Sequence, residues 1–229
     1  MCSLCYNYYM RKIKISPGEY YHIYNRGINK QKIFLDMSDY ARFLFCLLYF
    51  QSENTFNNFG HYVSFFKKSK KFNLSLKTMS KIISNRFVEL TNFCLMPNHF
   101  HITVLEVDEK GISTYMQRVL NSYTKYFNTK YKRSGHLFQG PYQIVYIKDN
   151  EQLLYLSTYI HKNPQEIKEI KKYDWKNYFW SSYQDYVKEN RWGEVLRTDI
   201  ILGQFKDENE YADFVKTSPA KIVDTRCPL

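Results

Sequence analysis

The sequence lacks any long hydrophobic run. It contains no stretch of about 18 consecutive apolar residues, and the apolar segment around "FLFCLLYF" is too short to cross a bilayer. The N-terminus also lacks the succession of basic segment, long apolar segment and small-residue cleavage site that marks a secretory signal. We therefore expect a cytoplasmic protein without a membrane partner.

Cysteine is scarce and irregularly placed. An odd number of cysteines scattered over the chain argues against a disulfide framework. Cys2 and Cys5 form one CxxC pair, and because no second pair follows, the signal for a structural zinc site is weak. The five cysteines are Cys2, Cys5, Cys46, Cys94 and Cys227.

Acidic residues are in deficit. The chain has 22 Asp and Glu against 33 Lys and Arg, which gives a formal net charge of +11 and a pI near 9.2. The cations are interleaved with 22 tyrosines and 17 phenylalanines. Because cations attract phosphates and aromatic rings stack on unpaired bases, this composition favours a single-stranded nucleic-acid binder. Many basic proteins bind no nucleic acid, and composition alone leaves that alternative open.

The hydrophobic pattern predicts alternating strands and helices. Periods of about two and 3.6 residues, together with glycine, proline and capping residues, mark the elements. Residues 52–73 are polar and basic without a clear period, which predicts a loop. The other expected elements are a strand over 19–27, a helix over 39–51, a short helix over 76–84, an antiparallel hairpin of strands over 86–96 and 99–107, an amphipathic helix over 111–130, a loop over 133–142, a strand over 142–148 and a helix over 149–164.

This order of elements predicts an α+β fold. It suits an antiparallel sheet with helices packed on one face and the other face open for a ligand. We expect a tail over 1–17, a main domain over 18–165 with an insertion loop over 52–75, and a C-terminal extension over 166–229.

Two histidines lie one residue apart at the start of the predicted strand "HFHITVLEV". Side chains alternate along a strand, so His99, His101 and Thr103 share one face while the residues between them face the core. Two imidazoles about 7 Å apart along a strand can bind one divalent cation if another segment supplies a further ligand. The alternative is a pair of strand histidines with ordinary hydrogen bonds.

The predicted helix over 149–164 is the best source of such a ligand. On a helical wheel Tyr155, Tyr159 and Lys162 fall opposite an apolar side, and Asn163 lies near them at the C-terminal end. With 22 tyrosines in the chain, a pair on one helix face does not by itself identify a nucleophile.

Six segments resemble, in order and spacing, the motifs of one protein family. They are "YYHIYNRG", "CLMPNHFHITV", "SYTKYF", "GHLFQGPY", "YLSTYIHKNP" and "WSSYQDY". The chain resembles the single-tyrosine HUH transposases, which are the IS200-like transposases, and especially their REP-associated tyrosine transposase branch. The resemblance runs from about residue 18 to about residue 190, and MPNHFH is its most specific motif.

The resemblance implies a fold and a set of site residues. The fold would be a ferredoxin-like or RRM-like α+β fold, in which helices pack on one face of an antiparallel sheet, followed by a helical C-terminal extension. His99 and His101 would bind Mg²⁺ or Mn²⁺. In "YIHKNP", which matches the family's "YIELNP", Tyr159 would be the nucleophile and Asn163 would assist the metal. His161 and Lys162 depart from the Glu and Leu of that motif.

The implied reaction is cleavage and rejoining of single-stranded DNA near hairpins through a 5′-phosphotyrosine intermediate. Whether one chain or a homodimer completes the active site stays open. The lysines at 67, 68, 70 and 71 favour a solvated charge run over a phosphate site. Because a glycine-containing loop lets a nucleic-acid strand approach closely, we expect DNA contacts at Arg26, Lys130, Lys132, Arg133, His136 and Gln139.

Three alternatives remain at this level. The first is a replication-initiator or relaxase-type nickase, which uses the same HUH chemistry. The second is a domesticated, non-catalytic DNA-hairpin-binding protein. The third is an RNA-binding module whose open sheet face stacks bases.

Overall fold

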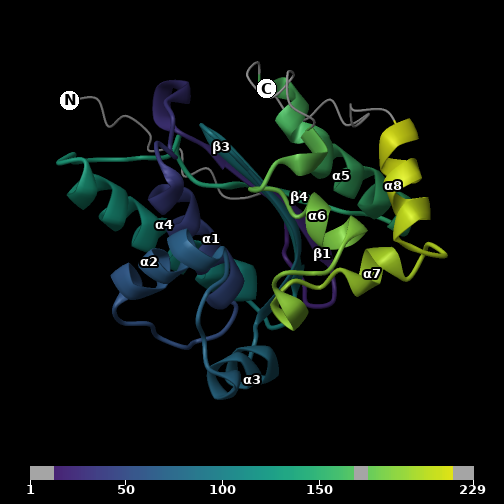
Figure 1. Ribbon diagram of the computed structural model, residues 1–229, viewed down its shortest axis with the longest axis horizontal. Coiled ribbons are helices and arrows are strands. Elements are labelled where there is room, and N and C mark those ends of the chain that lie inside the picture. Colours follow the sequence, from purple (N-terminus) through teal and green to yellow (C-terminus); the bar gives the residue numbers. More distant parts are fainter. Residues whose placement is uncertain (1–12, 168–174, 219–229) are drawn as a thin grey trace, which may run out of the picture.

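The core of the protein is a four-stranded antiparallel sheet. The computed structural model describes residues 13–167 and 175–218, and its strands lie in the order β2-β3-β1-β4 (Figure 1). The predicted α+β fold with an antiparallel sheet is confirmed. The strands are β1 (Tyr20–Arg26), β2 (Val88–Met96), β3 (His99–Glu106) and β4 (Gln143–Tyr146).

Strands β2 and β3 form the hairpin that the sequence predicts. Met96 pairs with His99 across the two-residue turn Pro97-Asn98. The turn is held against the end of β1, because the Gly27 N–H donates to the carbonyl of Asn98 over 2.8 Å. This bond fixes the start of β3, where the two histidines lie, beside the end of β1.

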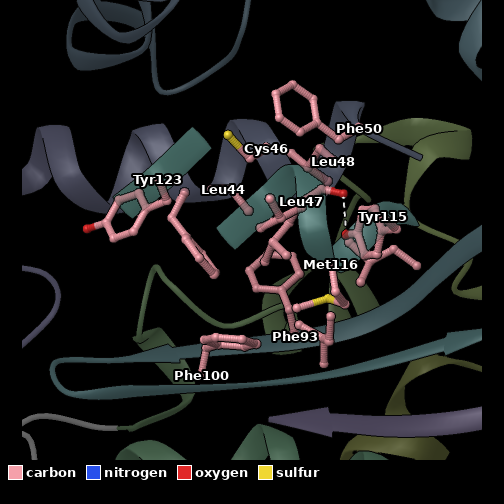
Figure 2. Close-up of a cluster of buried hydrophobic side chains, with 14 of the residues drawn as sticks. Leu44, Cys46, Leu47, Leu48, Phe50, Phe93, Phe100, Tyr115, Met116 and Tyr123 are labelled. Carbon is pink, nitrogen blue, oxygen red and sulfur yellow. Dashed lines mark hydrogen bonds between the residues drawn. The ribbon is translucent and has the colours of Figure 1, made fainter. Parts of the chain in front are cut away.

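Two long helices, α1 (Met37–Tyr49) and α4 (Gly111–Lys130), cover one face of the sheet. Their bounds agree with the predicted helices to within two residues. Side chains from both helices and from the strands form the main hydrophobic core (Figure 2). Phe100 of β3 packs on Phe43 of α1 with ring centroids 5.0 Å apart, and the Tyr115 hydroxyl of α4 donates to a backbone carbonyl of α1 over 2.6 Å.

Helix α5 and helices of the predicted C-terminal extension cover part of the other face of the sheet. Figure 1 places α5, α6 and α8 on the side of the sheet opposite α1 and α4. The extension supplies buried surface mainly through tyrosines on short helices, which carry no long apolar period for sequence analysis to detect. The helices here are α5 (Asn150–Lys162), α6 (Tyr183–Val187), α7 (Asp199–Leu202) and α8 (Glu208–Thr217), and their buried cluster includes Cys94, Met96, Leu153, Leu156, Ile160, Tyr186 and Tyr211.

The loop predicted over residues 52–73 contains a helix, α2 (Phe59–Ser69), so that prediction is wrong for these residues. Phe66 is fully buried and its ring stacks on Trp180 with centroids 5.8 Å apart. The neighbouring polar residues and lysines hide the helical period of the side chains that face the core. Those side chains are Phe59, Tyr62, Val63 and Phe66. Helix α3 (Leu76–Ser84) has the predicted bounds.

The remaining features are the hydropathy of the helices, the cysteines and the short 3₁₀ turns. Within the two described ranges no helix is long and apolar enough to span a membrane. Cys46 and Cys94 are buried free thiols, whereas Cys2, Cys5 and Cys227 lie outside the described residues. Short 3₁₀ turns lie at η1 (Ile28–Lys30), η2 (Asn163–Glu166), η4 (Trp175–Asn177) and η5 (Gly193–Val195).

Candidate active site

The candidate site begins with one row of side chains on β3 and β1. Directly opposite residues of an antiparallel pair point to the same face of the sheet. Arg26 is opposite His99, and Tyr24 is opposite His101. The register therefore brings the predicted DNA contact Arg26 to the face that carries the two predicted metal ligands.

Helix α5 places the other two predicted residues over this row. The helix starts at the N-cap Asp149, whose side chain accepts a hydrogen bond from the Gln152 N–H. Tyr159 and Asn163 are four residues apart, so they share one face of the chain as it leaves the helix. The Tyr159 ring lies almost perpendicular to the His101 ring, with centroids 5.4 Å apart. The four side chains predicted to carry the chemistry thus come together, while their roles stay predictions.

His99 is held between two amide oxygens. Its Nδ1 lies 2.7 Å from Asn98 Oδ1, and its Nε2 lies 3.2 Å from Asn163 Oδ1. Each amide also donates its NH₂ group to a backbone carbonyl, Asn98 to Lys30 over 3.2 Å and Asn163 to Tyr159 over 3.3 Å. These donations fix which amide atom faces the imidazole. A neutral imidazole has one N–H, so it can donate to only one of the two oxygens.

Burial keeps both imidazoles neutral. It lowers the pKa of His99 to about 4. The hydrogen bond that the protonated ring would donate to Asn163 opposes this shift, and the charge of Arg26 adds to it. Burial, followed by the nearby charges of His22, His99 and Arg26, lowers the pKa of His101 well below its usual value. Each ring therefore keeps a lone pair at neutral pH, as a metal ligand must.

The donor set of two imidazole nitrogens and one amide oxygen is compatible with a divalent cation. With Asn98 accepting the His99 N–H, a nitrogen lone pair faces Asn163 Oδ1, and a cation between them would remove the repulsion. Neighbouring ligands of an octahedral cation with bonds of about 2.1 Å lie about 3 Å apart. This spacing is close to the 3.2 Å between His99 Nε2 and Asn163 Oδ1.

The protein supplies few ligands to such a cation. Among residues 13–167 and 175–218 no three His, Cys, Asp or Glu side chains are grouped to hold a metal. A cation bound here would have the imidazoles of His99 and His101 and the amide oxygen of Asn163, which leaves coordination positions for water and substrate.

The sequence analysis missed one member of the site, His22 on β1. Its Nε2 lies 2.9 Å from His101 Nδ1, and both side chains are buried. The segment "YYHIYNRG" offers the signal that His22 and Tyr24 share a strand face. It does not reveal that this face meets His101, because the pairing register of β1 with β3 is not visible in the sequence.

The predicted DNA contacts lie in three different surroundings. Gln139 lies beside the site, since its N–H donates to the Arg26 carbonyl over 2.8 Å. Lys130 lies instead between Asp36 and Asp39, with its Nζ 2.7 Å from an oxygen of each. Burial opposes protonation of Lys130, but hydrogen bonds to the two carboxylates raise its pKa above the usual value.

The remaining predicted contacts lie in the loop after α4. Lys132 and His136 are exposed, and Arg133 is partly buried with its guanidinium over the Phe127 ring. These three side chains are accessible to a nucleic acid, and their role as DNA contacts stays a prediction. Tyr155, the alternative tyrosine of α5, is 39% exposed and packs against Phe214, on a different side of the helix from the site.

The two departures from the family motif anchor α5 to the C-terminal extension. His161 is fully buried, with Nε2 2.9 Å from Ser182 Oγ and Nδ1 2.7 Å from the Tyr211 hydroxyl. Lys162 donates to the backbone carbonyls of Lys216 and Ser218 at the end of α8, over 3.2 and 2.6 Å. The extension thereby holds the helix that carries Tyr159.

Comparison with known proteins supports the motif-based interpretation. The family model for "Transposase IS200 like" matches residues 63–163, which include His99, His101, Tyr159 and Asn163. No curated protein matches the chain. Among solved structures, that of a REP-associated tyrosine transposase bound to a REP hairpin is similar, with a TM-score of 0.50 and 13% identity over 78% of this chain and 84% of that one.

At that identity the structural likeness shows the fold, while the family match supports a DNA transposase-type function. Residues 63–163 therefore match the IS200-like transposase family, and the resemblance predicted from the motifs is confirmed.

Proposed function

We propose that the protein is a metal-dependent DNA strand transferase that cleaves and rejoins single-stranded DNA near hairpins. The main support for this proposal is the position of Tyr159. Its ring lies over His101, and on the same face of α5 Asn163 Oδ1 lies 3.2 Å from His99 Nε2. A hydroxyl nucleophile and a cation-binding donor set are thus adjacent, as phosphoryl transfer requires.

The chemistry conserves the energy of the phosphodiester bond. The Tyr159 oxygen attacks phosphorus, its bond to phosphorus forms, and the bond from phosphorus to the 3′ oxygen breaks. The phenol loses its proton and the departing oxygen gains one, which leaves a 5′-phosphotyrosine and a free 3′-hydroxyl. Attack by another 3′-hydroxyl reverses these steps, so a new strand is joined without ATP.

The side chains around Tyr159 have distinct tasks in this reaction. His99, His101 and Asn163 would hold the cation, which when bound supplies positive charge at the scissile phosphate. Arg26, opposite His99 on the same face, would bind a flanking phosphate. The rigid strand and the anchored helix keep these groups in a fixed relation, which favours a productive approach of the phenol.

The proposed substrate is DNA that contains a hairpin beside a single strand. The similar solved transposase is bound to a REP hairpin, and the net charge of +11 on this chain suits a polyanion. The exposed Lys132 and His136 lie in the loop that leads to Gln139, beside the site. We place the single strand at Arg26 and Gln139 and the stem along this loop.

Trapping of the covalent intermediate tests the proposal. The wild type, Tyr159→Phe and Tyr155→Phe would each be incubated with Mn²⁺ and labelled single-stranded DNA from the flanks of the gene, then separated on a denaturing gel. We expect an adduct with the wild type and with Tyr155→Phe and none with Tyr159→Phe, which should still bind DNA.

Two results would contradict the proposal. An adduct with Tyr159→Phe would remove Tyr159 as the nucleophile. Absence of an adduct from every variant, with tight hairpin binding retained, would identify a non-catalytic hairpin-binding protein.

A further inference from the structure

A buried hydrogen bond joins two histidines beneath the proposed catalytic centre. His22 Nε2 lies 2.9 Å from His101 Nδ1, and the side chains are 3% and 5% exposed. The two rings are nearly parallel, with an interplanar angle of 20°. The Tyr24 ring lies within 5.1 Å of the His22 ring and 5.6 Å of the His101 ring, measured between centroids. These contacts fix where both imidazoles lie.

The bond requires one proton between the two nitrogens. If His22 Nε2 carries it, His101 Nδ1 accepts, and a neutral His101 then has its remaining N–H at Nε2. If His101 Nδ1 carries it, His22 Nε2 accepts, and His101 Nε2 keeps a lone pair. Only the second arrangement leaves His101 able to bind a cation on the ring edge away from His22.

We propose that His22 is a positioning residue that holds His101 in the tautomer with its proton on Nδ1 and so directs Nε2 to the metal. The inference rests on the proposed function, because it concerns the same cation. Ligating histidines commonly donate their second N–H to a carboxylate, carbonyl or water, and this bond sets the tautomer and ring orientation. Here a second imidazole provides the acceptor.

The structure places His22 Nε2 at the position of the acceptor for that proton. His101 is buried, and its Nδ1 faces His22, so solvent does not offer a substitute. His99 has its own acceptor in Asn98, over 2.7 Å. Each of the two predicted histidine ligands thus has a separate acceptor for its Nδ1 proton, one on the hairpin turn and one on the neighbouring strand.

Mn²⁺ binding to the full chain, without DNA, tests the inference independently of activity. The variants are His22→Leu, which removes the acceptor, and His22→Gln, which keeps an amide oxygen near the position of Nε2. His101→Ala lacks a proposed ligand, so the Mn²⁺ that it still binds measures binding elsewhere on the protein. We expect His22→Leu to weaken Mn²⁺ binding by about 10- to 100-fold, and His22→Gln to weaken it by less than about tenfold. Free Mn²⁺ is measured by its electron paramagnetic resonance signal, and urea unfolding verifies that the variants fold.

The outcomes separate this inference from the proposed function. Unchanged Mn²⁺ binding in His22→Leu, or equal loss in both His22 variants, would overturn the positioning role while the metal site stands. Equal binding by the wild type and His101→Ala would overturn the metal site itself, and this inference with it.

Nitrogen-15 spectra of labelled histidine provide a second readout that packing alone would not change. In the metal-free wild type we expect the His101 proton on Nδ1, and in His22→Leu we expect it predominantly on Nε2. A wild-type spectrum with the proton on Nε2 would overturn the inference.

Discussion

Acid should weaken the attachment of α5 to the C-terminal extension through His161. This imidazole is fully buried between Ser182 and Tyr211, at 2.9 and 2.7 Å. Burial lowers the pKa of His161 to about 3, whereas a histidine in the unfolded chain has a pKa of about 6.5. The perturbation we consider is a fall in pH from 7.5 to 4.5, compared between the wild type and His161→Gln.

The sign and size of the effect follow from the two pKa values. Below about pH 6.5 the unfolded state binds a proton that the folded state does not, so stability is complete above this pH and is lost as the pH falls toward 3. At pH 4.5, about two units below the unfolded pKa, the loss from His161 is about 3 kcal/mol. Such a loss is a large part of the 5–15 kcal/mol that is typical of a folded domain.

Urea unfolding at pH 7.5 and pH 4.5 measures this loss. Glutamine is polar and of similar size but does not titrate, so the wild type should lose about 3 kcal/mol more stability than His161→Gln between the two pH values. The other buried histidines are present in both proteins, and their contributions cancel in the difference. An equal loss in the two proteins would refute the reasoning and would mean that His161 is not held neutral by its surroundings.

Two further predictions concern positions where the structure and the sequence-based expectation differ. Phe66→Ala should lower the free energy of unfolding in urea by about 3–5 kcal/mol, because it leaves a cavity beneath α2. The control is Phe65→Ala, whose side chain is 37% exposed. A similar loss in both variants would argue against the burial of the helix face that carries Phe66. Lys130→Met should cost about 1–3 kcal/mol, because it leaves the buried Asp39 carboxylate without its ammonium partner. The exposed Lys132→Met serves as its control, and unchanged stability in both lysine variants would show that the ion pair contributes little.

The sequence predicts the elements with a clear hydrophobic period. The hairpin of β2 and β3, helix α3 and helix α4 have bounds close to those expected. The HxH pair and Tyr159 meet because a strand and a helix each fix which residues share a face, and both periods are visible in the sequence. Local periodicity therefore predicted most of the fold and the shared strand face of His99 and His101, whereas the choice of Tyr159 and Asn163 came from the resemblance of "YIHKNP" to the family motif.

What the sequence could not provide depends on pairing between distant segments. His22 joins the site because β1 pairs with β3 in one register, and a shift of one residue would turn its side chain to the opposite face. The role of Lys130 depends on Asp36 and Asp39, about 90 positions earlier in the chain. The helix α2 was missed for a different reason, since its buried aromatic residues are embedded among lysines and polar residues.

The anchoring of α5 by the C-terminal extension also has an evolutionary consequence. His161 Nδ1 bonds to the Tyr211 hydroxyl, and Lys162 donates to the backbone carbonyl of Ser218. Exchange of Tyr211 alone would leave Nδ1 of the buried His161 without this partner. In related chains these distant positions should change together. Consider a chimaera that joins the first 165 residues to the extension of a relative with the "YIELNP" motif. Its His161 and Lys162 would meet an extension that is not matched to their hydrogen-bonding groups. The extension is thus matched to its own helix and is not an interchangeable module.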